Sequence, residues 1–143
     1  MSSGSHQNYT RIWANDLGVP VFSIDYRLAP KWKFPAALID VWQVYYWLIE
    51  RGCSELGIGN GGPPKKIVLV GDSAGGNLVA ALTILAIQRK YRIPDGIQLI
   101  YPGNNSFLYL FLGLNLSKYD ITPSMLLSLD DPILPFPFLQ SCL

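Results

Sequence analysis

A serine stands between two glycines in the pattern Gly-x-Ser-x-Gly, with Ser73 flanked by Gly71 and Gly75. A serine hydroxyl becomes a useful nucleophile only when it is held clear of the sheet, where a base can take its proton. A strand-like apolar run, 66–70, precedes the pattern and a helix-like run follows it, which is the layout of a nucleophile elbow. We expect the two glycines to make room for a tight turn, and Gly76 to let the helix pack close to the strand. The stretch therefore predicts a serine placed to attack a carbonyl carbon.

The residues on either side of the serine have supporting roles. Ala74 opens the expected helix, where free N–H groups and the positive end of the helix dipole favour negative charge. We expect its N–H to stabilise the oxygen anion that forms when the serine attacks. Asp72 is expected to fix neighbouring loops rather than to act as a base, because adjacent side chains in a tight turn diverge. The pattern fixes only three positions, so a chance occurrence is the alternative.

The general base that such a serine needs is missing after it. No histidine follows Ser73, although a strand-turn-helix of this kind orders its triad as Ser, then Asp or Glu, then His. His6 is the only histidine, and a triad in the order His, Asp, Ser would need Asp25 or Asp40 as its acid. Since that order belongs to another fold, His6 is interpreted as an exposed or helix-capping residue. The sequence also contains no HGGG-type turn to supply the second oxyanion donor.

Two acidic residues after the serine, Asp130 and Asp131, are candidates for the triad acid. Without a histidine to orient, that role would be empty. Pro132 and Pro135 lie beside them and favour a structural turn instead. The triad acid therefore stays unassigned.

Six segments ahead of residue 104 alternate between helix and strand patterns. Helices are expected at 5–16, 35–51 and 77–89, and strands at 19–24, 66–70 and 97–101. Gly18 and Gly52 are expected to end the first two helices. Apolar strands that alternate with helices predict an α/β fold with a parallel sheet covered on both faces. The segment 104–143 has no clear pattern and is poorly defined.

Two further features of the sequence invite a ligand-binding interpretation. Trp42, Tyr45, Tyr46 and Trp47 could stack on a ligand, but at helical spacing we predict that they belong to the core. The glycine-rich stretch 57–62 is predicted to be a surface loop. A phosphate-binding loop is rejected because two prolines follow the glycines, with no Gly-Lys-Ser/Thr.

The composition bounds the class of protein. Of the 143 residues, 50% are hydrophobic and 15% are charged, which favours a single domain with a substantial core. A net charge of +1 gives no reason to expect a nucleic acid as partner. One histidine and two cysteines without metal-binding spacing predict no zinc site, and we expect no cofactor.

The same features bear on location. Cys53 and Cys142 are interpreted as free thiols of an intracellular protein. The polar segment 1–8 lacks the apolar core of a secretory signal. The most apolar late run, 107–116, is shorter than the roughly 20 residues that span a bilayer. We therefore expect a cytoplasmic protein without a transmembrane segment.

Six short motifs lie along the chain: Asp25–Pro30 (DYRLAP), Phe34–Ala37 (FPAA), Gly71–Asn77 (GDSAGGN), Pro94–Gly96 (PDG), Tyr101–Pro102 (YP) and Ser128–Pro135 (SLDDPILP). Together they resemble the hormone-sensitive lipase group of α/β hydrolases. The resemblance covers nearly the whole chain, apart from 104–116. Joined motifs of this kind are far more specific than Gly-x-Ser-x-Gly alone.

The resemblance implies a partial α/β-hydrolase fold over residues 1–143. It also implies a serine carboxylic-ester hydrolase that acts on acylglycerols or related neutral esters. Ser73 aligns with the nucleophile that forms the acyl-enzyme, and Ala74 with an oxyanion donor. The HGGG turn of the family would lie before residue 1 and its catalytic Asp and His beyond residue 143, because Asp131 resembles a stretch ahead of that acid. The resemblance also implies association with lipid droplets, and it leaves the chain by itself inactive.

Two other interpretations stay open. Relatives such as the gibberellin receptors resemble the chain in keeping the elbow without the histidine, and they hold a small molecule. A non-catalytic binding protein is therefore the first alternative. The second is a truncated gene product that does not fold stably, because half a sheet leaves apolar edges and faces uncovered. Nothing in the sequence indicates an oligomeric state.

Overall fold

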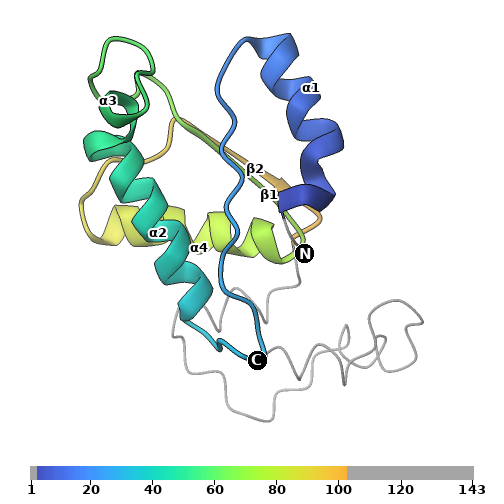
Figure 1. The fold of residues 1–143 in the computed structure, drawn as a ribbon. Coiled ribbons are helices and arrows are strands. Elements are labelled where there is room, and N and C mark those ends of the chain that lie inside the picture. Colours follow the sequence, from blue (N-terminus) through green and yellow to red (C-terminus); the bar gives the residue numbers. More distant parts are fainter. Residues whose placement is uncertain (1–2, 103–143) are drawn as a thin grey trace.

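Residues 3–102 are described by the computed structural model of the chain (Figure 1). The elements in chain order are η1 (Ser3–His6), α1 (Gln7–Leu17), α2 (Ala36–Trp47), η2 (Leu48–Gly52), α3 (Cys53–Glu55), β1 (Val68–Asp72), α4 (Ala74–Gln88) and β2 (Gly96–Ile100). The expectations for Asp130, Asp131, Cys142 and the run 107–116 concern residues outside the described range.

The two strands form a parallel pair, and α4 connects them. Val68 lies opposite Gly96, and Asp72 lies opposite Ile100. α4 packs against both strands, and α2 packs in turn against α4 (Figure 1). Parallel strands joined through a helix are the arrangement that the alternating pattern predicted for these segments, because parallel strands need a crossover connection.

The core lies between α2, α4 and the start of β1. Its buried residues are Val41, Tyr45, Ile49, Ile67, Leu78 and Leu82. Tyr45 is 3% exposed, and its hydroxyl donates a hydrogen bond to the Arg92 carbonyl at 2.7 Å. Among the four aromatic residues predicted to be core, only Tyr45 is fully buried, whereas Tyr46 is 48% exposed and Trp42 and Trp47 are half-buried. The reason is helix geometry: neighbouring positions turn by about 100°, so Tyr46 faces away from the stripe that Tyr45 occupies.

The predicted strand at 19–24 is wrong. The segment runs as an extended connection between α1 and α2, and it is not part of the sheet (Figure 1). Strand structure requires a neighbouring backbone for its ladder of hydrogen bonds, and the sheet of the described residues contains only β1 and β2. Val19 and Phe22 are 48% and 41% exposed, so burial on both faces is also wrong. Ile24 alone among these residues packs against the core.

The helix predicted for 35–51 continues beyond its expected end. Gly52 has helical φ and ψ angles of −59° and −40°, and the helical structure runs through η2 and α3 to Glu55. Gly52 serves close packing, because a Cβ at this position would lie 3.0 Å from the Trp47 ring. The left-handed residue that follows the helix is Gly57, with φ of +64°. The first helix ends as predicted, since Gly18 adopts φ of +61° directly after α1.

A reciprocal pair of hydrogen bonds holds the start of the sheet. The Ile67 N–H donates to the Asp95 carboxylate at 2.8 Å, and the Asp95 N–H donates to the Ile67 carbonyl at 2.9 Å. The Arg92 guanidinium donates to the same carboxylate at 3.3 Å. The Ile67 N–H, followed by Arg92, holds the pKa of Asp95 below its ordinary value. These contacts fix the relative position of the two strands at the end opposite the serine.

Candidate active site

Ser73 lies at the junction between β1 and α4. β1 ends at Asp72 and α4 begins at Ala74, so a single residue makes the turn. Ser73 has φ of 52° and ψ of −117°, a combination that residues with side chains rarely adopt. Its N–H donates to the Ile100 carbonyl at 2.9 Å, and its carbonyl accepts from the Asn77 N–H at 3.3 Å. Both Ser73 and Ala74 are exposed, whereas Asn77 is buried. The strand-turn-helix predicted from the sequence is present, with the serine side chain on the surface.

The glycines around the serine differ in how much space they require. A Cβ at Gly71 would lie 2.2 Å from the Gly75 carbonyl oxygen, so only glycine fits between β1 and the first turn of α4. A Cβ at Gly76 would lie 3.1 Å from the Gly71 oxygen and 3.3 Å from Pro102, which agrees with close packing of the helix on the strand. The expectation that Gly75 makes room for the turn is wrong, because a Cβ there would meet only Asp72 Oδ1, at 3.9 Å.

The carboxylate of Asp72 links three separate parts of the chain. His6 Nε2 lies 3.5 Å from Asp72 Oδ2, and the Tyr101 hydroxyl donates to the same oxygen at 3.3 Å. His6 precedes α1 and Tyr101 follows β2, while Asp72 is the last residue of β1. The contacts agree with the expectation that Asp72 fixes neighbouring segments.

His6 differs from its expected role. It occupies the N-cap position of α1, but its side chain makes no capping hydrogen bond. The side chain is 26% exposed and reaches the Asp72 carboxylate, and its ring lies 5.5 Å from the Tyr9 ring. No sequence pattern indicates this contact, since 66 positions separate the two residues. The interpretation of His6 as an exposed or helix-capping residue is therefore wrong, because its side chain is half-buried and caps no helix.

The Asp72 charge contributes to raised pKa values of two tyrosines, Tyr9 and Tyr26. Burial raises the pKa of Tyr9, and the negative charge of Asp72 and the Tyr101 hydroxyl raise it further. Burial likewise raises the pKa of Tyr26, with Asp72 as the second cause. A phenol beside a carboxylate keeps its proton because ionisation would place two negative charges together. The Asp72 charge thus favours the protonated form of both Tyr9 and Tyr26.

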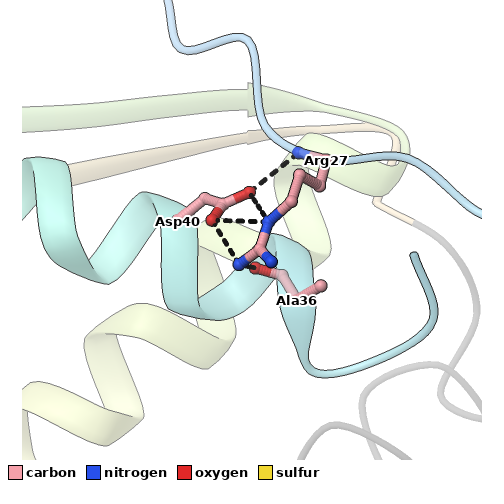
Figure 2. Close-up of polar contacts among 3 residues, drawn as sticks. All are labelled: Arg27, Ala36 and Asp40. Carbon is pink, nitrogen blue, oxygen red and sulfur yellow. Dashed lines mark hydrogen bonds and ion pairs between the residues drawn. The ribbon is translucent and has the colours of Figure 1, made fainter.

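Arg27 and Asp40 fasten the segment between α1 and α2 (Figure 2). Arg27 Nη2 donates to Asp40 Oδ1 at 2.7 Å, and Arg27 Nε donates to Oδ2 at 2.9 Å. The Arg27 N–H adds a bond to Oδ2 at 2.8 Å, and Nη2 reaches the Ala36 carbonyl at 3.5 Å. The side-chain hydrogen bond from Arg27 holds the pKa of Asp40 below its ordinary value. Asp40 is therefore engaged by Arg27, and the alternative that it serves as the acid for His6 is not supported.

Sequence reasoning missed both partners of Asp72 and the Arg27–Asp40 pair. Tyr101 was expected only to complete a strand, although a parallel register places the residue after Ile100 beside the end of β1. Cys53 is buried and forms no disulfide, in line with the expected free thiol. Within residues 3–102, no group of three His, Cys, Asp or Glu side chains is arranged to hold a metal ion.

Comparison with known proteins places this geometry in a family. The family model described as the alpha/beta hydrolase fold matches residues 1–125. The chain belongs to the α/β hydrolase family. This match confirms the predicted fold class, and the 40% identity to hormone-sensitive lipase confirms the resemblance to that group.

Individual proteins similar to the chain are lipases and esterases. The chain is 40% identical over 141 residues to hormone-sensitive lipase of Mus musculus, an alignment that covers 99% of this chain. It is also 40% identical over 102 residues to ethyl acetate hydrolase of Pseudomonas putida, covering 71% of this chain and 30% of that protein. A solved structure, the hyperthermophilic esterase from the archaeon Pyrobaculum calidifontis, has a TM-score of 0.75 and 34% identity, covering 98% of this chain and 41% of that one.

The chain is much shorter than these relatives. It spans 16% of the length of the mouse hormone-sensitive lipase and 41% of the archaeal esterase. Over residues 3–102, no helix is both long enough and apolar enough to cross a membrane.

Proposed function

We propose that Ser73 is the nucleophile of a carboxylic-ester hydrolase that acts on acylglycerols or related neutral esters. The observation that carries the proposal is the position of Ser73, exposed and with φ of 52° in a one-residue turn between a parallel strand and a helix. A strained residue at such a junction is typical of functional sites. The names of the relatives, a lipase, an ethyl acetate hydrolase and esterases, support a carboxylic ester as substrate.

In the proposed reaction, Ser73 Oγ attacks the carbonyl carbon of the ester. The hydroxyl proton passes to a general base, and the tetrahedral intermediate collapses to an acyl-enzyme as the alcohol leaves with that proton. Water then attacks the acyl-enzyme and gives one of its protons to the general base, and the base passes this proton to Ser73 Oγ as the carboxylic acid is released. The Ala74 N–H, at the first position of α4, is proposed to donate to the oxygen anion in both steps.

The 143 residues contain no histidine after Ser73, so we propose that the general base is contributed from outside this sequence. The 143-residue chain alone is then inactive as an esterase. A cytoplasmic location, indicated by the cysteine usage, and association with lipid droplets, implied by the resemblance to the hormone-sensitive lipase group, belong to the same proposal.

The test uses the longest protein product that contains this chain. A fluorophosphonate probe should label it at Ser73, as mapped by peptide mass spectrometry, and Ser73→Ala should abolish both labelling and hydrolysis of p-nitrophenyl butyrate. Equal labelling of the Ser73→Ala variant would overturn the assignment of the nucleophile. Turnover by the 143-residue chain that is lost in Ser73→Ala would overturn the proposed external base.

A non-catalytic binding protein is the second candidate. The specific observation in its favour is that His6, the only histidine of the sequence, is engaged by Asp72. A binding protein should retain an intact ester analogue in calorimetric titration and release it unchanged. Hydrolysis of the bound ester would exclude this candidate.

A further inference from the structure

Two donors from distant parts of the chain converge on one oxygen atom next to the proposed nucleophile. His6 Nε2 and the Tyr101 hydroxyl both contact Asp72 Oδ2, at 3.5 Å and 3.3 Å. Asp72 directly precedes Ser73, so contacts that hold the Asp72 side chain also restrain the peptide bond between Asp72 and Ser73. The carboxylate is only 24% exposed, which strengthens its hydrogen bonds relative to those of an exposed group.

Backbone strain is concentrated at the same place. Ser73 has φ of 52° and Tyr101 has φ of 36°, and only one other non-glycine residue in the described part of the chain, Lys90, has a positive φ. Such conformations persist only where the surrounding structure over-determines them. The Ser73 N–H has one backbone bond, to the Ile100 carbonyl, at the end of β2. The Asp72 contacts supply the additional constraint, because Tyr101 follows Ile100 directly.

The helix that begins directly after His6, α1, needs such a contact. No residue of α1 is fully buried, and Ile12 and Leu17 are 56% and 69% exposed. A helix without a buried face gains little from apolar packing, so its position depends on specific contacts at its ends and edges. His6, supported by the ring of Tyr9 at 5.5 Å, connects the start of α1 to the end of β1.

We propose that His6 and Tyr101 are positioning residues that hold the Ser73 turn through the Asp72 carboxylate. The reactivity of Ser73 then depends on the docking of α1, although neither residue touches the substrate. The part of the inference that concerns reactivity rests on the proposed function, whereas the conformational part stands on the contacts alone. Burial, followed by the Asp72 charge, raises the pKa values of Tyr9 and Tyr26, so the titratable neighbours of the carboxylate include both tyrosines.

The conformational part is tested by amide hydrogen exchange measured by NMR on the chain as encoded. Tyr101→Phe and His6→Ala should each accelerate exchange of the Ser73 amide by about tenfold, because the first removes a hydrogen bond to the Asp72 carboxylate and the second removes the Nε2 contact with the same oxygen. The amides of Leu82 and Ala86, buried in the middle of α4, should exchange at the wild-type rate. His6→Gln retains a donor and should restore slow exchange at Ser73.

Tyr46→Phe is the matched control, since it removes the hydroxyl of an exposed tyrosine on α2 whose ring stacks on Tyr91 at 5.5 Å. It should leave exchange at Ser73 unchanged. Equal acceleration at Ser73, Leu82 and Ala86 would overturn the proposal, because the contacts would then stabilise the whole fold. Unchanged exchange at Ser73 in both Tyr101→Phe and His6→Ala would overturn it as well.

The reactive part is tested by the kinetics of fluorophosphonate labelling in the longest encoded protein. Loss of positioning should lower the maximal inactivation rate in Tyr101→Phe and His6→Ala by about tenfold and leave the inhibitor constant KI unchanged. His6→Gln should label at nearly the wild-type rate, and complete loss of labelling in this variant would assign His6 as the base instead. Wild-type protein that resists labelling refutes the proposed function, and the exchange data still decide whether the Asp72 contacts hold the turn.

Discussion

The guanidinium of Arg27 lies edge-on to the carboxylate of Asp40 and binds it through two parallel hydrogen bonds, at 2.7 Å and 2.9 Å (Figure 2). Arg27 belongs to the extended segment after α1, and Asp40 lies in the first half of α2. A fork of this kind fixes direction as well as distance, since the planar guanidinium matches the carboxylate. The pair therefore determines how the segment that leads away from α1 crosses α2.

Replacing the fork by a single donor tests this role. Arg27→Lys keeps the charge but loses the parallel pair of hydrogen bonds, so we expect the Tm to fall by about 2–4 °C in differential scanning calorimetry. Arg51→Lys is the matched control, because the Arg51–Glu55 contact is longer, at 3.6 Å, and both side chains are at least half exposed. Equal shifts in the two variants would show that the fork adds nothing beyond a surface charge.

The acid stability of the chain should depend on Asp40. Arg27 lowers the pKa of the Asp40 carboxyl in the folded chain, mainly through the side-chain hydrogen bond. The resulting stabilisation is fully present above the unfolded pKa of about 3.9, and it is lost as the pH falls through the lower folded value. Thermal unfolding between pH 6 and pH 2.5 should show a smaller acid-induced loss of stability in Asp40→Asn than in wild type.

Arg27→Gln checks the cause of this effect, because it removes the hydrogen bond that lowers the pKa of Asp40. Its acid-induced loss of stability should be smaller than that of wild type but larger than that of Asp40→Asn, because the backbone N–H of residue 27 still donates to Asp40. Asp95 has a pKa lowered chiefly by the Ile67 N–H, so Asp95→Asn should reduce the acid sensitivity independently. A wild-type acid limb in Arg27→Gln would refute the assignment to the Arg27 hydrogen bond.

The close approach of β1 to α4 predicts opposite effects of alanine at Gly71 and at Gly75. Gly71→Ala should destabilise the fold by about 3 kcal/mol, since its Cβ would lie 2.2 Å from the Gly75 oxygen and backbone atoms would have to move. Gly75→Ala places its Cβ no closer than 3.9 Å to another side chain, and it should leave stability unchanged or raise it by about 0.5–1 kcal/mol through helix propensity. Urea unfolding of both variants provides the comparison, and similar losses would contradict the geometry.

Much of the site was predictable because its signals are local. The glycines and the apolar runs on either side of Ser73 specify a strand, a turn and a helix within a short stretch of sequence. The end of α1 was also predictable, because Gly18 readily adopts the positive φ angle that ends a helix. The contacts of His6 and Tyr101 with Asp72 were not predictable from pattern, because each depends on how elements pack in space.

The errors in the fold have the same origin. The segment 19–24 has the β-branched composition of a strand, but a strand forms only where a neighbouring backbone offers ladder hydrogen bonds. Gly52 was expected to end a helix, whereas its missing side chain admits the Trp47 ring within a continuing helix. In both cases tertiary surroundings decide between conformations that the local sequence allows.

The strain at Ser73 leads to a prediction that separates function from stability. A non-glycine residue at φ of 52° and ψ of −117° costs about 1–3 kcal/mol, and glycine adopts the same conformation without that cost. Glycine also loses about 0.5–1 kcal/mol more backbone entropy on folding. The net result is that Ser73→Gly should be about 1 kcal/mol more stable than Ser73→Ala in urea unfolding. Both variants lack the hydroxyl, so the difference reports on the backbone alone. If Ser73→Gly is instead less stable than Ser73→Ala by about 0.5–1 kcal/mol, the entropy cost alone, the turn is not strained, and the preorganisation of Ser73 for attack loses its main support.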